Sequence, residues 1–369
     1  MRLVAVKSVT EGAQLAKPIY NDNGQILLYE GVELTQRSLT RLYELGISFI
    51  YIHDERTNGI EIETGVSVET KRKAIKTIKT EFQEIASNLK LKKSFNMDHF
   101  NKDFATIVRA ILSDIKNNEN ALTLLSDMFV YDSYIFTHSL NVTVYTLGLA
   151  VDLGFTDKQL MEIGMGSLLH DIGKMTIPVE ILNKPGRLTD EEFKVIQNHS
   201  MAGYNILRHA PNISLLSAHC ALQHHERLDG TGYPQGLQKN DIHYYAKIIA
   251  IADVFDAVTS NRVYRKPMLP HEALELLYSG VGNQFEQDLV EAFRRTVAVY
   301  PVGLTVTLSD DRVGIVVKQN KQLSTHPVVR IIEENGVEIT QTYDIDLMKQ
   351  LNVTIVATEA TLAAASLQV

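Results

Sequence analysis

The middle of the chain carries a helical pattern of apolar and polar residues. Between residues 100 and 298, apolar side chains recur every three to four positions, which places them on one face of a helix. A similar pattern over residues 68–89 has a strongly charged surface, typical of a solvated amphipathic helix. The pattern predicts helices over residues 103–116, 133–152, 157–173, 189–209, 213–225, 244–259, 270–278 and 286–299. We therefore expect a mainly α fold with a helical bundle at its centre.

The two ends of the chain carry shorter, strand-like patterns. Near the N-terminus, Thr35 is suited to cap a helix that Gly46 ends, and residues 48–52 predict a strand. After Pro301 the chain becomes rich in β-branched residues. Strands are predicted over residues 305–308, 313–317 and 327–332, with turns at residues 21–24, 309–311 and 335–336. Both ends are therefore expected to form small β-containing domains.

These patterns divide the chain into four predicted parts. They are a small α/β accessory domain at residues 1–65, a helical linker at 66–100, a helical domain at 101–300 and a small β-rich domain at 301–369. Residues 226–243 interrupt the helical domain. This polar stretch contains three glycines and a proline, so it predicts a functional loop rather than a helix.

Composition narrows the classes of function. The net charge of −8 at pH 7 argues against binding DNA or RNA, which requires a basic field. No apolar stretch reaches the roughly 18 residues of a membrane span, and the N-terminus has no signal peptide, so we expect a cytoplasmic protein. The single cysteine, Cys220, excludes an internal disulfide and a thiolate cluster. Any metal ion would therefore bind to histidine and carboxylate side chains.

The histidines point to such a metal site. Of the 12 histidines, those from residue 138 to residue 243 are too dense to be scattered core residues. His170 and Asp171 are adjacent at the end of an apolar helix, and because adjacent helical residues point about 100° apart, both reach one centre only at a helix end. Asp253 interrupts an apolar helix and would be costly to bury alone. Asp256, one turn later, is suited to orient a ligand.

Three motifs occur together in this region: HDIGK at 170–174, HHE at 224–226 and DGTGYP at 229–234. The combination resembles the HD-GYP family, metal-dependent phosphohydrolases that open bacterial cyclic dinucleotides, and the resemblance covers residues 110–295. It implies an HD-type helical bundle as the catalytic domain. It also implies two divalent metal ions, Fe or Mn ahead of Zn or Ni, bound by His138, His170, Asp171, His199, His224, His225 and Asp253.

The number of metal ions rests on one further position. Family members that hold a third metal use a glutamate four residues before the first metal histidine. This chain has Tyr134 at that position, and tyrosine is a poor ligand for divalent ions. The sequence therefore favours a centre of two metals.

The substrate residues are predicted around the same motifs. Lys174 follows the His-Asp pair by about one helical turn, where a cation can bind a phosphate oxygen and stabilise developing charge. With Asp171 it forms the predicted catalytic pair. Gly232 permits close backbone approach, and Tyr233 offers a ring to a base and a hydroxyl to a phosphate. The resemblance adds Arg262 and Arg265, which suit a phosphodiester, to the substrate-binding set of Lys174, Gly232 and Tyr233.

The expected reaction is hydrolysis of cyclic di-GMP to linear pGpG, and further cleavage to GMP stays open. The residues do not select the base, so a phosphodiesterase for cyclic GMP-AMP and a general HD phosphohydrolase remain alternatives. A third alternative is a sensor that binds the dinucleotide without cleaving it; loss of a ligand or of Lys174 would mark such a protein, and neither is lost. A homodimer, and protein partners for the terminal domains, also stay open.

Overall fold

The computed structural model describes residues 1–21, 25–45, 47–60, 65–91, 97–117, 134–184, 186–260, 267–320 and 323–359. The chain divides into two compact units. One unit combines Met1–Thr64 with Val297–Val369, and the other contains Gly65–Leu122 and Ser133–Thr296. The two end segments, predicted as separate domains, thus lie in one unit. The predicted linker helix lies in the helical unit.

The N-terminal part of the first unit is small and mixed. Strand β1 (Arg2–Ala5) pairs antiparallel with β4 (Phe49–Ile52), and β2 (Ile19–Tyr20) pairs antiparallel with β3 (Ile26–Leu28). The remaining elements are η1 (Val6–Ser8), α1 (Gln36–Glu44) and η2 (Glu55–Thr57). Thr35 caps α1 as predicted, because its hydroxyl accepts a hydrogen bond from the Ser38 amide at 3.2 Å. Gly46 and the predicted turn at residues 22–24 lie outside the described residues.

The C-terminal part forms a five-stranded antiparallel sheet. Its strands are β5 (Thr305–Leu308), β6 (Val313–Lys318), β7 (Val328–Glu334), β8 (Val337–Asp346) and β9 (Ile355–Thr358), in the order β8-β7-β6-β5-β9. The predicted turn between β7 and β8 is present, with positive φ angles of 51° at Asn335 and 77° at Gly336. Strand β8 was not predicted, because most of its side chains are exposed and it lacks an apolar face.

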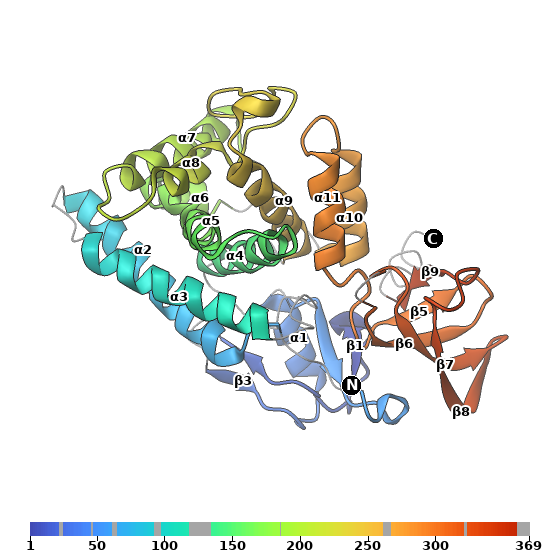
Figure 1. The fold of residues 1–369 in the computed structure, drawn as a ribbon. Helices are drawn as coiled ribbons and strands as arrows, with labels where there is room; N and C mark the ends of the chain where they lie inside the picture. The colour runs from blue at the N-terminus through green and yellow to red at the C-terminus, as the bar shows by residue number, and fades with distance from the viewer. Residues whose placement is uncertain are drawn as a thin grey trace. The chain divides into compact units, whose positions relative to one another are not determined.

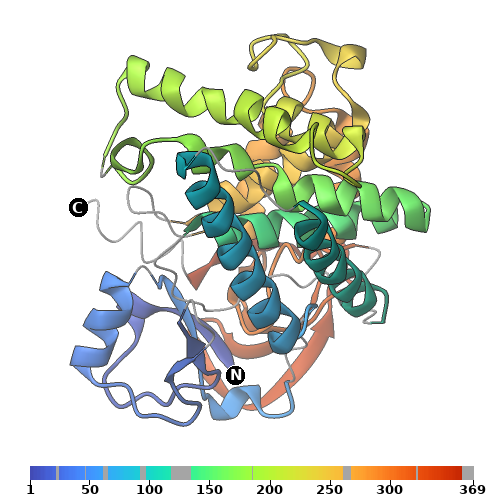
Figure 2. The same ribbon diagram turned by 90° about the vertical axis from the view of Figure 1, so that its left-hand side faces the viewer.

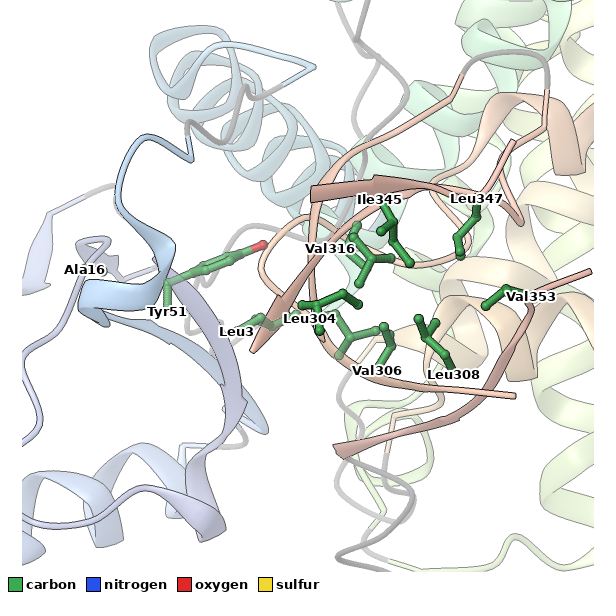
Figure 3. Close-up of a cluster of buried hydrophobic side chains, with 12 residues drawn as sticks. Leu3, Ala16, Tyr51, Leu304, Val306, Leu308, Val316, Ile345, Leu347 and Val353 are labelled. Atoms are coloured by element: carbon green, nitrogen blue, oxygen red, sulfur yellow. The ribbon is translucent and has the colours of Figure 1, made fainter. Parts of the chain in front are cut away.

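A shared core explains why the two ends form one unit. Leu3 and Tyr51, from the N-terminal strands, pack with the buried side chains of the C-terminal sheet (Figure 3). Leu3 also donates a backbone hydrogen bond to the Gly303 carbonyl at 2.8 Å. The N-terminal segment also has a separate buried cluster of its own, so the shared core adds apolar burial that neither segment provides alone.

Among the described residues of the second unit, the regular elements are all helices (Figure 1). Helices α2 and α3, the first two helices of this unit in the sequence, pack against each other (Figure 2). Helix α4 lies at the centre and packs against α5, α9 and α11, while α7 and α5 both pack against α8. The elements are α2 (Val68–Leu91), α3 (Met97–Asn117), α4 (Tyr134–Asp152), α5 (Asp157–Leu169), η3 (Ile172–Thr176), α6 (Val179–Leu182), α7 (Asp190–Leu207), α8 (Leu215–Gln223), η4 (Lys239–Asp241), α9 (Tyr244–Thr259), α10 (Pro270–Ser279) and α11 (Gln287–Thr296). The mainly α fold is confirmed.

One predicted helix boundary is wrong in a way that matters for the site. The helix expected over residues 157–173 ends at Leu169, and the chain continues as the 3₁₀ turn η3. The break lets η3 pack directly against α7: a Cβ at Gly173 would lie 1.9 Å from the carbonyl oxygen of His199. His170 and Asp171 therefore lie between two elements rather than on a continuous helix. The last helix is also shorter than predicted, ending at Thr296.

Candidate metal centre

The predicted metal ligands lie on elements that pack against one another. They are His138 on α4, His170 at the end of α5, Asp171 at the start of η3, His199 on α7, His224 and His225 at and after the end of α8, and Asp253 on α9. All except His225 are buried. Burying this many polar groups together is costly unless they are paired or bind a metal.

Four of these histidines share one hydrogen-bonding arrangement. In each, Nδ1–H donates to an acceptor outside the cluster, which fixes the ring and directs Nε2 toward the cluster. The acceptors are the carbonyl oxygens of Ser167 for His170 (2.7 Å), Ile196 for His199 (2.6 Å) and Ala221 for His224 (3.0 Å), and the Asp256 carboxylate for His138 (2.7 Å). The local helix geometry thus presents the nitrogen that a metal would bind.

The Nε2 atoms of His199 and His224 lie 3.2 Å apart. Because Nδ1 carries the proton in both neutral rings, the two Nε2 lone pairs face each other, and they repel unless a cation lies near them. His170 Nε2 and Asp171 Oδ1 are buried and have no hydrogen-bond partner among the described residues. A divalent metal ion would satisfy all of these atoms, so the residues present fit a metal centre.

Asp171 links two groups of ligands. One group is His138, His170 and Asp171, and the other is Asp171, His199, His224 and His225; in each group the ligand atoms lie within 4.8 Å of one another. Asp171 Oδ2 is 3.5 Å from His138 Nε2 and 3.4 Å from His170 Nε2. Its Oδ1 is 3.4 Å from His199 Nε2 and 3.8 Å from His224 Nε2. Each oxygen thus faces a different group, as in a carboxylate that bridges two metals.

Asp253 lies between the same two groups. Its Oδ1 is 3.0 Å from His138 Nε2, and its Oδ2 is 3.7 Å from His225 Nδ1. A second carboxylate therefore approaches both halves of the cluster. Asp256, one turn later on α9, is held by Asn141 Nδ2 and Ser260 Oγ, each at 2.9 Å, and holds His138 in turn. This is the orienting contact predicted for Asp256.

The protonation states of most of the predicted ligands suit a metal, and His138 is the exception. Burial lowers the pKa of His199 to about 4 and that of His225 to about 3, because a buried imidazolium loses its hydration. At His138, burial acts in the same direction, but hydrogen bonds to Asp253 and Asp256 outweigh it and raise the pKa to about 9. Burial also opposes ionisation of Asp171, yet Lys174 and the histidines hold the pKa of this carboxyl well below its usual range. Neutral imidazoles and ionised carboxylates are the forms that bind divalent ions, so His199, His225 and Asp171 are already in the binding form, whereas a metal at His138 would have to displace a proton.

Lys174 lies beside the shared carboxylate. It follows Asp171 within η3, and its Nζ donates a hydrogen bond to Asp171 Oδ2. Its side chain is partly buried, so the positive charge is only partly screened by water. A cation beside the cluster can stabilise negative charge on a bound phosphate.

The loop after α8 covers one side of the centre. The Tyr233 ring lies over the His225 ring, with centroids 4.7 Å apart and planes 33° apart. Gly232 passes so close to the preceding chain that a Cβ would lie 2.4 Å from the Arg227 nitrogen. Asp229 holds the start of the loop by accepting hydrogen bonds from the Thr231 amide and hydroxyl. The glycines therefore serve the loop's close packing as well as any ligand.

Glu226 supports the loop, a role that was not predicted from the sequence. This buried carboxylate accepts hydrogen bonds from the Gln235 amide at 2.7 Å and the Leu237 amide at 2.9 Å, so it ties the far end of the loop to the end of α8. Its place directly after the histidine pair was visible, but its burial was not. The position of Glu226 beside two predicted ligands indicated that it has a role, but only its buried hydrogen bonds show that this role is to hold the loop.

Some predicted site residues cannot be placed. Arg262 and Arg265 lie outside the described residues, and so does the side chain of Tyr134. The structure therefore brings together the seven predicted metal ligands, Lys174 and the Gly232–Tyr233 segment, and it leaves the two arginines as predictions.

Comparison with known proteins agrees with this geometry. Residues 113–289 match the family described as HD domain, and residues 305–362 match a KOW domain associated with HD domain. The chain is 38% identical over 225 residues to the cyclic di-GMP phosphodiesterase PA4108 of Pseudomonas aeruginosa. The aligned region covers 61% of this chain and 54% of that protein. Residues 113–289 therefore form an HD domain, and the similarity to these relatives supports the HD-GYP family.

The similarity covers only part of each relative's sequence. The chain spans about half the length of the curated relatives it matches first. Another relative, the 3′3′-cGAMP-specific phosphodiesterase 2 of Vibrio cholerae, is 39% identical over 155 residues, 42% of this chain and 30% of that protein. Among solved structures, the chain is similar to Bd1817, an HDG"Y"P protein from Bdellovibrio bacteriovorus, with 19% sequence identity and a TM-score of 0.47. The superposed region covers 79% of this chain and 97% of the Bd1817 chain. Within the described residues, no helix has the length and apolar character to cross a bilayer.

Proposed function

We propose that this chain is a metal-dependent phosphodiesterase that hydrolyses cyclic di-GMP to linear pGpG. The observation that carries the proposal is the position of Asp171, whose two oxygens face two separate histidine groups. That arrangement suits two divalent ions. The name of the Pseudomonas aeruginosa relative supports cyclic di-GMP as the substrate.

In the proposed reaction, a water oxygen forms a bond to phosphorus, and the bond between phosphorus and the 3′ oxygen breaks. The leaving 3′ oxygen takes up a proton, so one ring opening yields pGpG. When bound, two divalent ions supply an activated water and neutralise charge on the phosphate oxygens. The residues that would hold them are His138, His170, Asp171, His199, His224, His225 and Asp253.

The chain's other residues bind and orient the substrate. Lys174 places its ammonium group beside Asp171 and would stabilise charge on the phosphate. Tyr233 is positioned by its contact with His225 and by the loop that Glu226 holds. We propose that Arg262 and Arg265 contact the phosphates, because guanidinium groups bind phosphate oxygens in pairs.

Two further points belong to the proposal. The metals are two in number because Tyr134 occupies the position of the family's third-metal glutamate, and they are Fe or Mn, with Zn or Ni as alternatives. The cGAMP-specific relative in Vibrio cholerae favours cyclic GMP-AMP as the second candidate substrate. Cleavage on to GMP, self-association and protein partners for the terminal segments stay predictions.

The proposal predicts hydrolysis that depends on metal. Protein purified without oxygen and loaded with Mn²⁺ or Fe²⁺ should convert cyclic di-GMP to pGpG, and treatment with a chelator should abolish the conversion because the ligands alone cannot activate water. Chromatography of the products measures both. A parallel incubation with cyclic GMP-AMP ranks the two substrates by kcat/KM. Metal-loaded protein that cleaves neither dinucleotide would contradict the proposal and favour a sensor.

Replacing the loop tyrosine should separate recognition of the nucleotide from chemistry. Tyr233→Ala removes a ring that can contact a base, a loss worth about 1–3 kcal/mol per base. It should lower kcat/KM for cyclic di-GMP by roughly tenfold or more, and it should lower hydrolysis of bis-p-nitrophenyl phosphate much less. Tyr233→Phe keeps the ring and serves as the control, with metal content measured in each variant. Equal losses for both substrates would mean that the loop shapes the metal centre instead.

A further inference from the structure

An exposed aromatic side chain adjoins the loop tyrosine. Phe193, on α7, is 47% exposed, which is unusual for a large apolar ring. Its ring is 6.3 Å from that of Tyr233, and the two planes are nearly perpendicular, at 81°. Tyr233 in turn lies over His225, a predicted metal ligand. A series of three rings thus leads from the predicted ligand His225 through Tyr233 to the exposed side chain of Phe193.

The backbone that carries each ring is held by contacts within the chain. Phe193 lies in the first turn of α7, where Thr189 and Glu192 form a capping box and Lys184 Nζ contacts the Glu192 carboxylate at 2.6 Å. The Phe193 amide donates a hydrogen bond to the Thr189 carbonyl at 2.8 Å. Tyr233 is fixed by its own amide, which donates to the His225 carbonyl at 3.2 Å. The backbone positions of the two perpendicular rings are therefore set by the chain itself.

We propose that Phe193 is a specificity-determining residue that stacks on a purine base of the dinucleotide. This inference rests on the proposed function. With a phosphate at the metal centre, each base lies one ribose away, and Phe193 is connected to the ligand His225 through the single ring of Tyr233. A base parallel to Phe193 would present its edge to Tyr233. Every purine has a π-face, and phenylalanine offers no hydrogen bond, so Phe193 selects substrates that carry a base without distinguishing guanine from adenine.

Fluorescence tests this contact without relying on turnover. The chain contains no tryptophan, so Phe193→Trp introduces a single indole at the proposed stacking position. On rapid mixing of the metal-loaded variant with cyclic di-GMP, the stacked guanine should quench the indole emission before hydrolysis proceeds. The matched control is Tyr244→Trp, because Tyr244 is also an exposed aromatic, at 43%, but begins α9 nine residues before Asp253. Quenching of the Phe193→Trp protein alone supports the proposal. Equal quenching of both proteins, or of neither, overturns it.

Kinetics give an independent readout. Phe193→Ala should raise KM for cyclic di-GMP and for cyclic GMP-AMP by a similar factor, about tenfold, while metal content and kcat change little. Phe193→Tyr should restore KM, and Tyr244→Ala should leave it unchanged. If wild type is active and the KM of Phe193→Ala stays within twofold of the wild-type KM, the inference is overturned while the proposed function stands. If cyclic di-GMP quenches the Phe193→Trp protein but metal-loaded wild type never cleaves the dinucleotide, the proposed function fails and the stacking contact stands.

Discussion

Replacing Asp171 by asparagine (Asp171→Asn) is expected to abolish hydrolysis of cyclic di-GMP. The two oxygens of this carboxylate face two different histidine groups, at 3.4–3.8 Å, so asparagine removes the negative charge that both halves of the centre share. The loss should exceed the roughly 10- to 100-fold that follows from mutating a residue outside the ligand set. Metal per chain, measured by elemental analysis, should fall together with kcat.

The control for this prediction is Asp157→Asn. Asp157 is 89% exposed at the start of α5 and pairs with Lys116 on the surface, so its replacement removes one carboxylate without touching the centre. Circular dichroism should show the same helix content for both variants and for wild type. If the activity of Asp171→Asn stays within a few-fold of wild type, the carboxylate is not shared by the two histidine groups, and Asp171 is only a polar contact.

The fold was predictable where local sequence determines local structure. Thr35 caps α1 through its own hydroxyl, and the Asn335–Gly336 turn requires residues that tolerate positive φ, so both were correctly predicted. The end of α5 was not predictable. Leu168 and Leu169 continue the apolar helical pattern, and the break after them depends on how closely η3 approaches α7. The sequence places a helix end near His170 and Asp171, but the apolar pattern and Gly173 put it four residues too late.

The candidate site shows the same division. Histidines and aspartates at a characteristic spacing pointed to one centre, and the structure places all seven predicted ligands on elements that surround it. Glu226 and Phe193 were not assigned roles, because their significance depends on exposure: the carboxylate is 4% exposed and the phenyl ring 47%. Both values are the reverse of what each residue type usually shows, and only a three-dimensional structure reveals such a reversal.

Adding a single methyl group between the two halves of the centre should be as damaging as removing a ligand. In Gly173→Ala, the new Cβ would lie 1.9 Å from the His199 carbonyl oxygen and 2.6 Å from the Gly203 nitrogen, and both are backbone atoms that cannot rotate away. The contact can be relieved only if η3 and α7 move apart. Because Asp171 adjoins η3 and His199 belongs to α7, that movement separates the carboxylate from one of its histidines. Overpacking of this kind typically costs about 1–3 kcal/mol, so calorimetry should show a Tm lower by roughly 2–12 °C, with metal content and activity largely lost.

Gly203→Ala is the matched control, because it adds the same methyl group to the same contact from the other side. There the nearest atoms are the Ala221 Cβ and the Gly173 nitrogen, both at 3.3 Å, so the helices need to yield by only a few tenths of an ångström. Alanine also favours a helix interior over glycine by about 0.5–1 kcal/mol, which offsets the tight contact. Gly203→Ala should therefore retain its metal and most of its activity while Gly173→Ala loses both. Similar Tm values and metal contents in the two variants would mean that the distance between η3 and α7 does not control the centre, and that the ligands can rearrange around a displaced Asp171.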